Sequence, residues 1–126
     1  MILIIGLPNA GKTTYSIQFE NVIHFDNIPH TNNEEWYNKC DELAKKSSDD
    51  ITIEGIYNNR NRRIKLLEAC KDKSIKKCIW IDTDVKECIK RENRNRSIHT
   101  IIGHHTLFEP PTYDEGWDEI IILKDK

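Results

Sequence analysis

The chain has 126 residues, with 19 Lys and Arg against 21 Asp and Glu, and its formal net charge at pH 7 is −2. A chain of this length can form a hydrophobic core of useful size but is too short for two domains, so we expect one domain over residues 1–126. The slightly negative net charge argues against binding along a long stretch of nucleic acid. It is still compatible with binding the end of a strand.

We expect neither a membrane span nor a signal peptide. No apolar segment approaches the ~18 residues of a transmembrane helix, and no basic segment precedes the first apolar run. Four cysteines form no C-x-x-C pair and no metal-ligand spacing: Cys40, Cys70, Cys78 and Cys88. They are typical of reduced, mostly buried thiols in a cytoplasmic protein.

The clearest functional pattern lies in the first 14 residues. Ile2–Ile5 is an unbroken aliphatic run, as expected of a strand buried on both faces of a parallel sheet. The sequence Gly6-x-x-x-x-Gly11-Lys12-Thr13 follows and matches the phosphate-binding loop at every required position. Backbone N–H groups between the two glycines can surround phosphate oxygens, and a helix expected over 13–19 adds the positive end of its dipole.

This loop predicts binding of ATP, or of another nucleoside triphosphate, together with Mg²⁺. Lys12 can reach the β- and γ-phosphates, and the Thr13 hydroxyl can ligate the metal. We expect the nucleotide to contact seven consecutive residues: Pro8, Asn9, Ala10, Gly11, Lys12, Thr13 and Thr14.

Strands and helices alternate along the rest of the chain. Apolar runs predict further strands over 21–25, 51–54, 76–82 and 119–123. Helices are expected over 33–46, 60–71, 84–94 and 97–108. This alternation predicts a three-layer α/β fold of the P-loop kinase class, with a five-stranded parallel sheet between helices.

Two of these helices have a predicted core face. The helix capped by Asn32 or Asn33 would bury one stripe, formed by Trp36, Cys40, Leu43 and Ala44. The helix over 60–71 would bury Ile64, Leu67 and Cys70 and turn its basic residues outward.

Carboxylates follow several strands, and in a parallel sheet these ends meet at one edge. Gly6, Asp26, Glu54 and Asp82 would gather there. Asp26 could accept the proton of a hydroxyl that attacks the γ-phosphate; the alternative is a local Asx turn. Glu54 could bind Mg²⁺-bound water or the substrate, and its alternative is an ion pair with Arg60 or Arg63.

Three arginines come close together after the fourth strand: Arg91, Arg94 and Arg96. Guanidinium groups over the phosphates would neutralise the charge of phosphoryl transfer, so we expect a short Arg-rich lid over about 91–108. The alternative is a solvent-exposed basic face.

Five segments in order resemble the phage-type polynucleotide 5′-kinases and their small zeta-toxin-like P-loop kinase relatives. These segments, which span nearly the whole chain, are Gly6–Thr14, Asp26, Ile53–Arg63, Glu87–Arg94 and Phe108–Asp118. The resemblance implies that Asp26 is the general base and that Lys12 and Thr13 serve ATP and Mg²⁺. It implies that Arg91, with Arg94 or Arg96, forms the lid.

The resemblance also shapes the expected acceptor. Glu54 falls where the family commonly carries an Asp, whereas Pro29 replaces an Arg that in the family contacts nucleic-acid phosphate. A virus-encoded protein acting in a host cytoplasm fits the phage likeness.

The expected activity is ATP-dependent transfer of the γ-phosphate to the 5′-hydroxyl of DNA or RNA. Lys12, Asp26, Arg91 and Arg94 would be catalytic, and a single-stranded 5′ end would contact Glu54, Arg62, Arg63 and Arg96. A kinase of nucleosides, nucleotides or other small molecules is the alternative enzyme. A nucleotide-binding switch without catalysis is the alternative of another class. Nothing in the sequence implies a protein partner.

Overall fold

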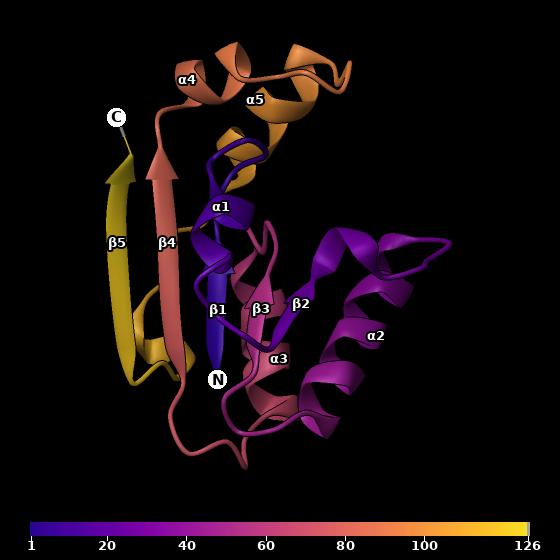
Figure 1. Ribbon diagram of the computed structural model, residues 1–126, viewed down its shortest axis with the longest axis vertical. Helices are drawn as coiled ribbons and strands as arrows, with labels where there is room; N and C mark the ends of the chain where they lie inside the picture. The colour runs from indigo at the N-terminus through magenta and orange to yellow at the C-terminus, as the bar shows by residue number, and fades with distance from the viewer. Residues whose placement is uncertain (126) are drawn as a thin grey trace.

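The computed structural model describes residues 1–125, with side chains to residue 124, and contains one parallel sheet of five strands (Figure 1). Its strands, in the spatial order β2-β3-β1-β4-β5, are β1 (Ile2–Ile5), β2 (Val22–His24), β3 (Thr52–Glu54), β4 (Lys77–Thr83) and β5 (Glu119–Asp125). Every neighbouring pair is parallel. The predicted five-stranded α/β fold is confirmed.

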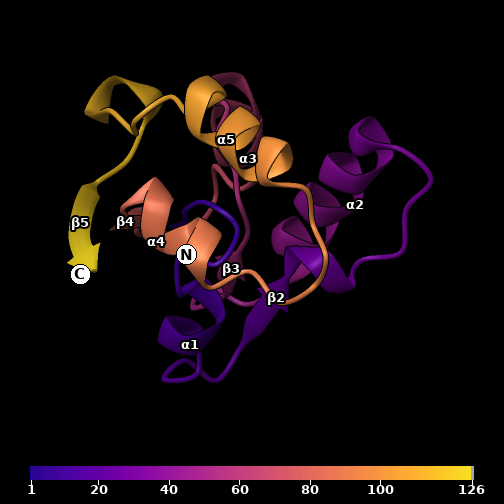
Figure 2. The same ribbon diagram turned by 90° about the horizontal axis from the view of Figure 1, so that it is seen from above.

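Helices cover both faces of the sheet. They are α1 (Lys12–Ser16), α2 (Asn33–Lys46), α3 (Arg60–Ala69), α4 (Val85–Lys90) and α5 (Ile98–Leu107). Viewed from above, α1 lies on one face, and α2 and α3 lie on the other (Figure 2). Short 3₁₀ turns occupy Phe25–Asn27 and Tyr113–Glu115. Within the described part of the chain, no helix combines the length and apolarity needed to cross a bilayer.

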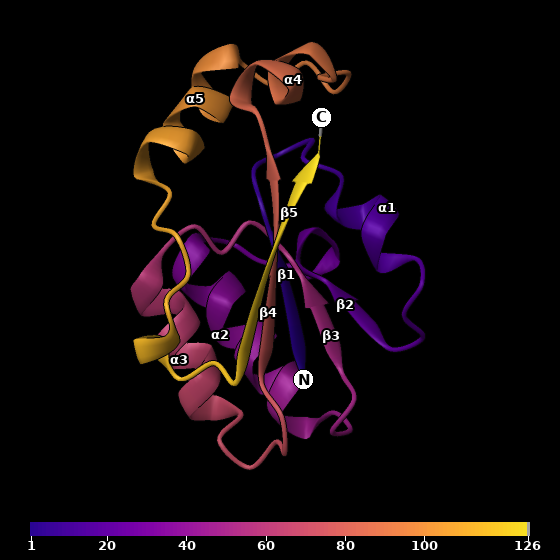
Figure 3. The same ribbon diagram turned by 90° about the vertical axis from the view of Figure 1, so that its left-hand side faces the viewer.

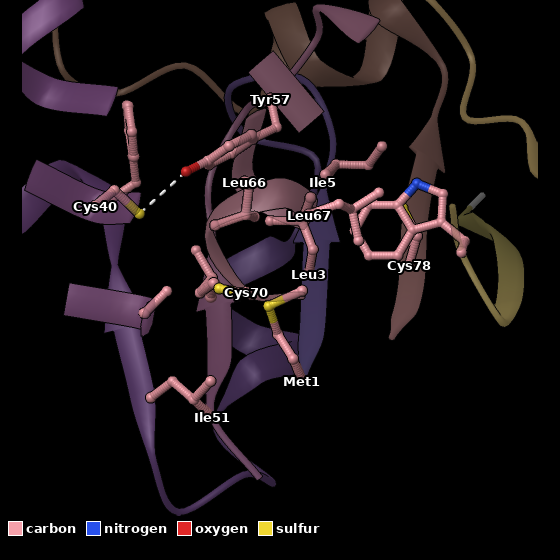
Figure 4. Close-up of a cluster of buried hydrophobic side chains, with 14 of the residues drawn as sticks. Met1, Leu3, Ile5, Cys40, Ile51, Tyr57, Leu66, Leu67, Cys70 and Cys78 are labelled. Atoms are coloured by element: carbon pink, nitrogen blue, oxygen red, sulfur yellow. Dashed lines mark hydrogen bonds between the residues drawn. The ribbon is translucent and has the colours of Figure 1, made fainter. Parts of the chain in front are cut away.

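β1 is the centre of the core because both of its faces are buried. Leu3 and Ile5 belong to the cluster under α2 and α3, and Ile4 belongs to the cluster on the opposite face. Figure 4 shows the first cluster, in which the Tyr57 hydroxyl donates to Cys40 Sγ at 3.0 Å. All four cysteines are buried free thiols, as predicted. The edge-on view in Figure 3 shows how helices enclose the sheet between them.

Helices α1, α2 and α4 differ from their predicted extents or faces. α1 ends at Ser16 rather than near residue 19. α2 begins after the predicted Asn32 cap, but its Leu43 is 47% exposed instead of joining the core stripe. α4 ends at Lys90, because the next turn of backbone binds the Glu92 carboxylate instead of continuing the helix.

The core face of α3 is rotated from the predicted one. Arg63, Leu66, Leu67 and Cys70 are buried, whereas Ile64 is only partly buried. The prediction that Arg63 faces outward was therefore wrong. A buried guanidinium is tolerated here because every side of it meets an acceptor.

Glu115 is the main acceptor for Arg63. Arg63 Nε and one terminal nitrogen donate to the two Glu115 oxygens at 2.8 and 3.0 Å. The guanidinium also donates to the backbone carbonyl oxygens of Tyr57 and Glu109, both at 2.8 Å. Burial raises the pKa of Glu115, but the bonds from Arg63 and Trp117 outweigh it and keep that pKa below its usual value. This pair fastens the segment before β5 to α3.

Removing one partner of this pair should strongly destabilise the fold. Glu115→Ala leaves the Arg63 charge buried and unpaired, so we expect a loss of roughly 3–5 kcal/mol in the free energy of unfolding. Asp114→Ala is the matched control: it removes the exposed carboxylate that pairs with Arg60, and we expect about 1 kcal/mol or less. Urea denaturation measures both, and equal losses would contradict this account.

Candidate active site

The loop between β1 and α1 has the backbone that a phosphate-binding loop requires. A Cβ on Gly6 would lie 2.8 Å from the Ile81 carbonyl oxygen, so only glycine fits where the chain leaves β1. Gly11 has φ of 104°, in the left-handed region that favours glycine. The Thr83 hydroxyl donates to the Ala10 carbonyl oxygen at 2.7 Å and fixes the loop to β4.

Lys12 lies buried inside this loop. Its Nζ donates to the carbonyl oxygens of Gly6 and Leu7, at 3.0 and 2.7 Å. Burial lowers the pKa of Lys12 from 10.5 to about 8, although the nearby Glu54 and Asp26 carboxylates act in the opposite direction. A desolvated ammonium of this kind is stabilised by a bound anion.

A cavity of about 410 Å³ opens above the loop. It is lined by Pro8, Asn9, Gly11, Lys12, Thr13, Thr14, Asp26, Glu54, Gly55, Ile56, Arg91, Asn93, Arg94 and Arg96. Most of the predicted site residues therefore lie together. Among the predicted loop residues, Ala10 is the exception, since its side chain is buried. Asp82, expected at this edge, instead lines a different cavity and pairs with Lys124.

Asp26 reaches the cavity from the 3₁₀ turn that follows β2. The Trp36 indole N–H donates to the Phe25 carbonyl oxygen, and the two rings stack with centroids 4.2 Å apart. These contacts hold the turn in place. Among the described residues, none forms a hydrogen bond or ion pair with the Asp26 carboxylate, and its side chain is exposed. No structural partner competes with a substrate for it, so the alternative of a local Asx turn finds no support.

Glu54 has a partner that the sequence did not reveal. Its Oε2 lies 2.9 Å from His24 Nδ1, and the two residues sit opposite each other in the β2–β3 register. Neither Arg60 nor Arg63, the partners considered from sequence, pairs with it: Arg60 pairs with Asp114. The Glu54 side chain is 7% exposed and still lines the cavity.

The three arginines predicted to form a lid have different surroundings. Arg91 donates to Glu87 Oε1 at 3.1 Å and to the Asn9 carbonyl oxygen at 3.3 Å. Arg96 donates to Glu92 and to the Asn9 side chain. The Arg94 guanidinium has no hydrogen bond or ion pair to any residue that the structure describes.

Arg62 and Arg63, predicted to bind substrate, lie outside this cavity. Arg62 pairs with Glu34 at 2.6 Å and covers the Tyr37 ring at 4.7 Å from its centroid. Arg63 is buried with Glu115, as described above. The basic channel expected from these two residues is therefore absent from the described structure.

The site fits a magnesium nucleotide. Thr13 is exposed and lines the cavity with Glu54. No group of three or more His, Cys, Asp or Glu among the described residues could hold a metal alone. Mg²⁺ in phosphoryl-transfer sites needs no such group, since one or two side chains and the phosphate oxygens hold it.

No protein-family model matches the chain, and a search of curated proteins finds no match. Solved structures share its fold. A sugar kinase from Janibacter sp. HTCC2649 is 18% identical with a TM-score of 0.74, covering 98% of this chain and 83% of that one. A gluconokinase from Sinorhizobium meliloti 1021 is 14% identical with a TM-score of 0.67, covering 98% and 81%.

A fungal RNA kinase is also similar: identity is 14%, the TM-score is 0.65, and the match covers 99% of this chain but 39% of that one. At these identities the likeness shows the fold alone. The chain has a P-loop kinase-like fold.

Proposed function

We propose that this chain is an ATP-dependent phosphotransferase that transfers the γ-phosphate to a hydroxyl group. One observation carries the proposal: a buried lysine of a phosphate-binding loop and a carboxylate without a structural partner line the same cavity, beneath an arginine that has no ion pair among the described residues. These residues are Lys12, Asp26 and Arg94.

On the donor side, Lys12 binds the phosphates and Thr13 holds Mg²⁺, which supplies charge neutralisation when it is bound. Pro8, Asn9, Gly11 and Thr14 line the donor part of the cavity. Arg94 neutralises the charge that develops on the transferred group, and Arg91 stabilises the adjoining phosphates. Arg96 is held by Glu92 and Asn9, so we assign the lid function to Arg94.

On the acceptor side, Asp26 orients the hydroxyl and takes its proton as the oxygen forms a bond to the γ-phosphorus. The bond from phosphorus to the β–γ bridging oxygen breaks at the same time, and the nucleoside diphosphate leaves. Glu54, fixed by His24, faces the same space. An Asp26 carboxylate without a structural partner among the described residues argues against a non-catalytic switch protein.

The pairing of Arg62 with Glu34 and of Arg63 with Glu115 supports a small hydroxyl compound as acceptor. A strand of nucleic acid needs several cations along its backbone, and these two were the expected ones. The 5′-hydroxyl of a polynucleotide is the second candidate, favoured by the sequence resemblance and by the shared fold of an RNA kinase.

The direct test is transfer of labelled γ-phosphate to a panel of acceptors. The panel contains 5′-hydroxyl DNA and RNA, 3′-nucleoside monophosphates, free nucleosides, sugars and gluconate. We expect transfer to at least one hydroxyl compound, with Mg²⁺ required. Tight ATP binding without transfer to any of these, and without hydrolysis, would contradict the proposal and favour the switch.

Salt dependence separates the two acceptor classes. A strand contacting about three phosphates would give a log–log slope of about −2 for the acceptor kcat/KM, whereas an uncharged acceptor gives almost none. We expect a slope well short of −2 for a small acceptor, near zero if it is uncharged, and no effect of Arg62→Ala on that slope. The salt dependence of ATP is measured separately, because Mg·ATP is itself an anion. A steep slope that Arg62→Ala flattens would restore the polynucleotide.

A further inference from the structure

One carboxylate organises the segment over residues 91–97, which connects α4 to α5. Glu92 Oε1 accepts from the Asn9 side-chain amide at 2.8 Å and from Arg96 Nε at 2.9 Å. Glu92 Oε2 accepts from the backbone N–H groups of Arg94 and Arg96, at 2.7 and 3.1 Å. Both oxygens are therefore saturated by the segment itself and by the phosphate-binding loop.

Asn9 is the loop's side of this connection. Its amide nitrogen also donates to the Cys88 carbonyl oxygen at 3.0 Å, and its amide oxygen accepts from Arg96 at 2.7 Å. Asn9 itself has φ of 68°, a conformation that Asn tolerates better than most residues. Figure 1 shows the segment between α4 and α5 at the same end of the sheet as this loop. Loop and segment thus form one hydrogen-bonded unit.

A carboxylate beside a phosphate site needs a reason, since it repels the anion that binds there. The negative charge of Glu92 does not help to bind the nucleotide. Its side chain is 12% exposed, and the bond from Asn9, followed by the backbone N–H groups, lowers its pKa to about 2. It therefore remains an acceptor of four hydrogen bonds at neutral pH. Its role is to hold the backbone of this segment and the Asn9 side chain in place.

We propose that Glu92 is a positioning residue that locks the arginine segment onto the phosphate-binding loop and so leaves Arg94 preorganised over the cavity. All four hydrogen bonds of this lock come from residues of the chain itself. The catalytic part of this inference rests on the proposed phosphotransfer, whereas the lock consists of contacts within the chain and is testable without nucleotide.

Two variants and one control test it in the full chain. Glu92→Ala removes all four bonds, and Glu92→Gln retains the shape and part of the accepting capacity. Glu119→Ala is the control, because Glu119 pairs with Lys77 at the opposite end of the sheet. Amide hydrogen exchange of residues 92–97 is measured without ligand and with a non-hydrolysable ATP analogue, alongside kcat, analogue Kd and Tm.

For Glu92→Ala we expect exchange at Arg94 and Arg96 to be about tenfold faster or more in the ligand-free protein. We expect kcat to fall about 30-fold or more, because a misplaced guanidinium loses its transition-state contact. The analogue Kd should stay within about threefold, because Lys12 and the loop still bind the phosphates. The exchange rates and kcat of Glu92→Gln should lie between those of Glu92→Ala and the wild type. Glu119→Ala should match the wild type.

Unchanged exchange in Glu92→Ala would overturn the proposal whatever the activity, and so would faster exchange with unchanged kcat. If the wild type transfers phosphate to no acceptor, the proposed function fails and exchange decides the lock alone. The Arg94 amide should then be protected in the wild type both without and with the analogue, and it should exchange faster in Glu92→Ala under both conditions. Equal protection in both proteins would overturn the lock as well.

Discussion

Lys12→Met is expected to reduce phosphoryl transfer by about 10³-fold, because the lysine is the cation that the loop places inside the phosphate site. The ATP analogue should also bind more weakly. The fold should survive, since Lys12 bonds only the carbonyl oxygens of Gly6 and Leu7 and Met fills a similar volume. Undiminished transfer by this variant would remove the basis of the proposed function.

The pH dependence gives a second test of Lys12. The folded chain holds this proton only up to about pH 8, whereas the unfolded chain holds it to about 10.5. Between these values the unfolded state binds more protons, so the wild type gains stability as pH rises. At pH 7 the buried charge is a cost that Lys12→Met removes, and its Tm should be equal or higher. Nucleotide affinity of the wild type should fall above about pH 8.

The parts of the fold that follow from hydrophobic pattern were predictable. Ile2–Ile5 is aliphatic throughout because both faces of β1 are buried, and Asn32 caps α2 as its side chain suggests. The core face of α3 was not predictable. Its apolar spacing is compatible with burial of either Ile64 or Arg63. Arg63 is the buried residue because its guanidinium pairs with the distant Glu115. The sequence around Arg63 does not indicate its burial, because the partner on which that burial depends is 52 residues away.

The candidate site likewise contains residues that the sequence could predict and residues that it could not. The loop spacing fixes Lys12 and Thr13, and strand ends in a parallel sheet bring Asp26 and Glu54 to one edge. The contacts of Glu92, on which its proposed positioning role rests, were missed because they depend on Asn9, 83 residues away. Charge alone could not distinguish Arg94 from Arg96, since only their contacts differ. His24 could have been found, because it ends β2 directly beside the end of β3.

Asp26→Asn should lower turnover by about 10²-fold or more, because the amide keeps the shape of the carboxylate but cannot take the hydroxyl proton. The turn should not move, since Trp36 and Phe25 hold it through backbone and ring contacts. The nucleotide Kd should therefore stay within about threefold, while kcat carries the loss.

Asp82→Asn is the matched control for this test. Asp82 also lies near the carboxyl end of a strand of the same sheet, but it pairs with Lys124 and lines a different cavity. A general effect of removing a carboxylate from this edge of the sheet would appear in both variants, whereas loss of a base appears only in Asp26→Asn. If Asp26→Asn keeps its rate while ATP binding weakens, the carboxylate belongs to the donor side. Proton transfer from the acceptor would then need another group, and Glu54, held by His24 beside the same space, is the residue to change next.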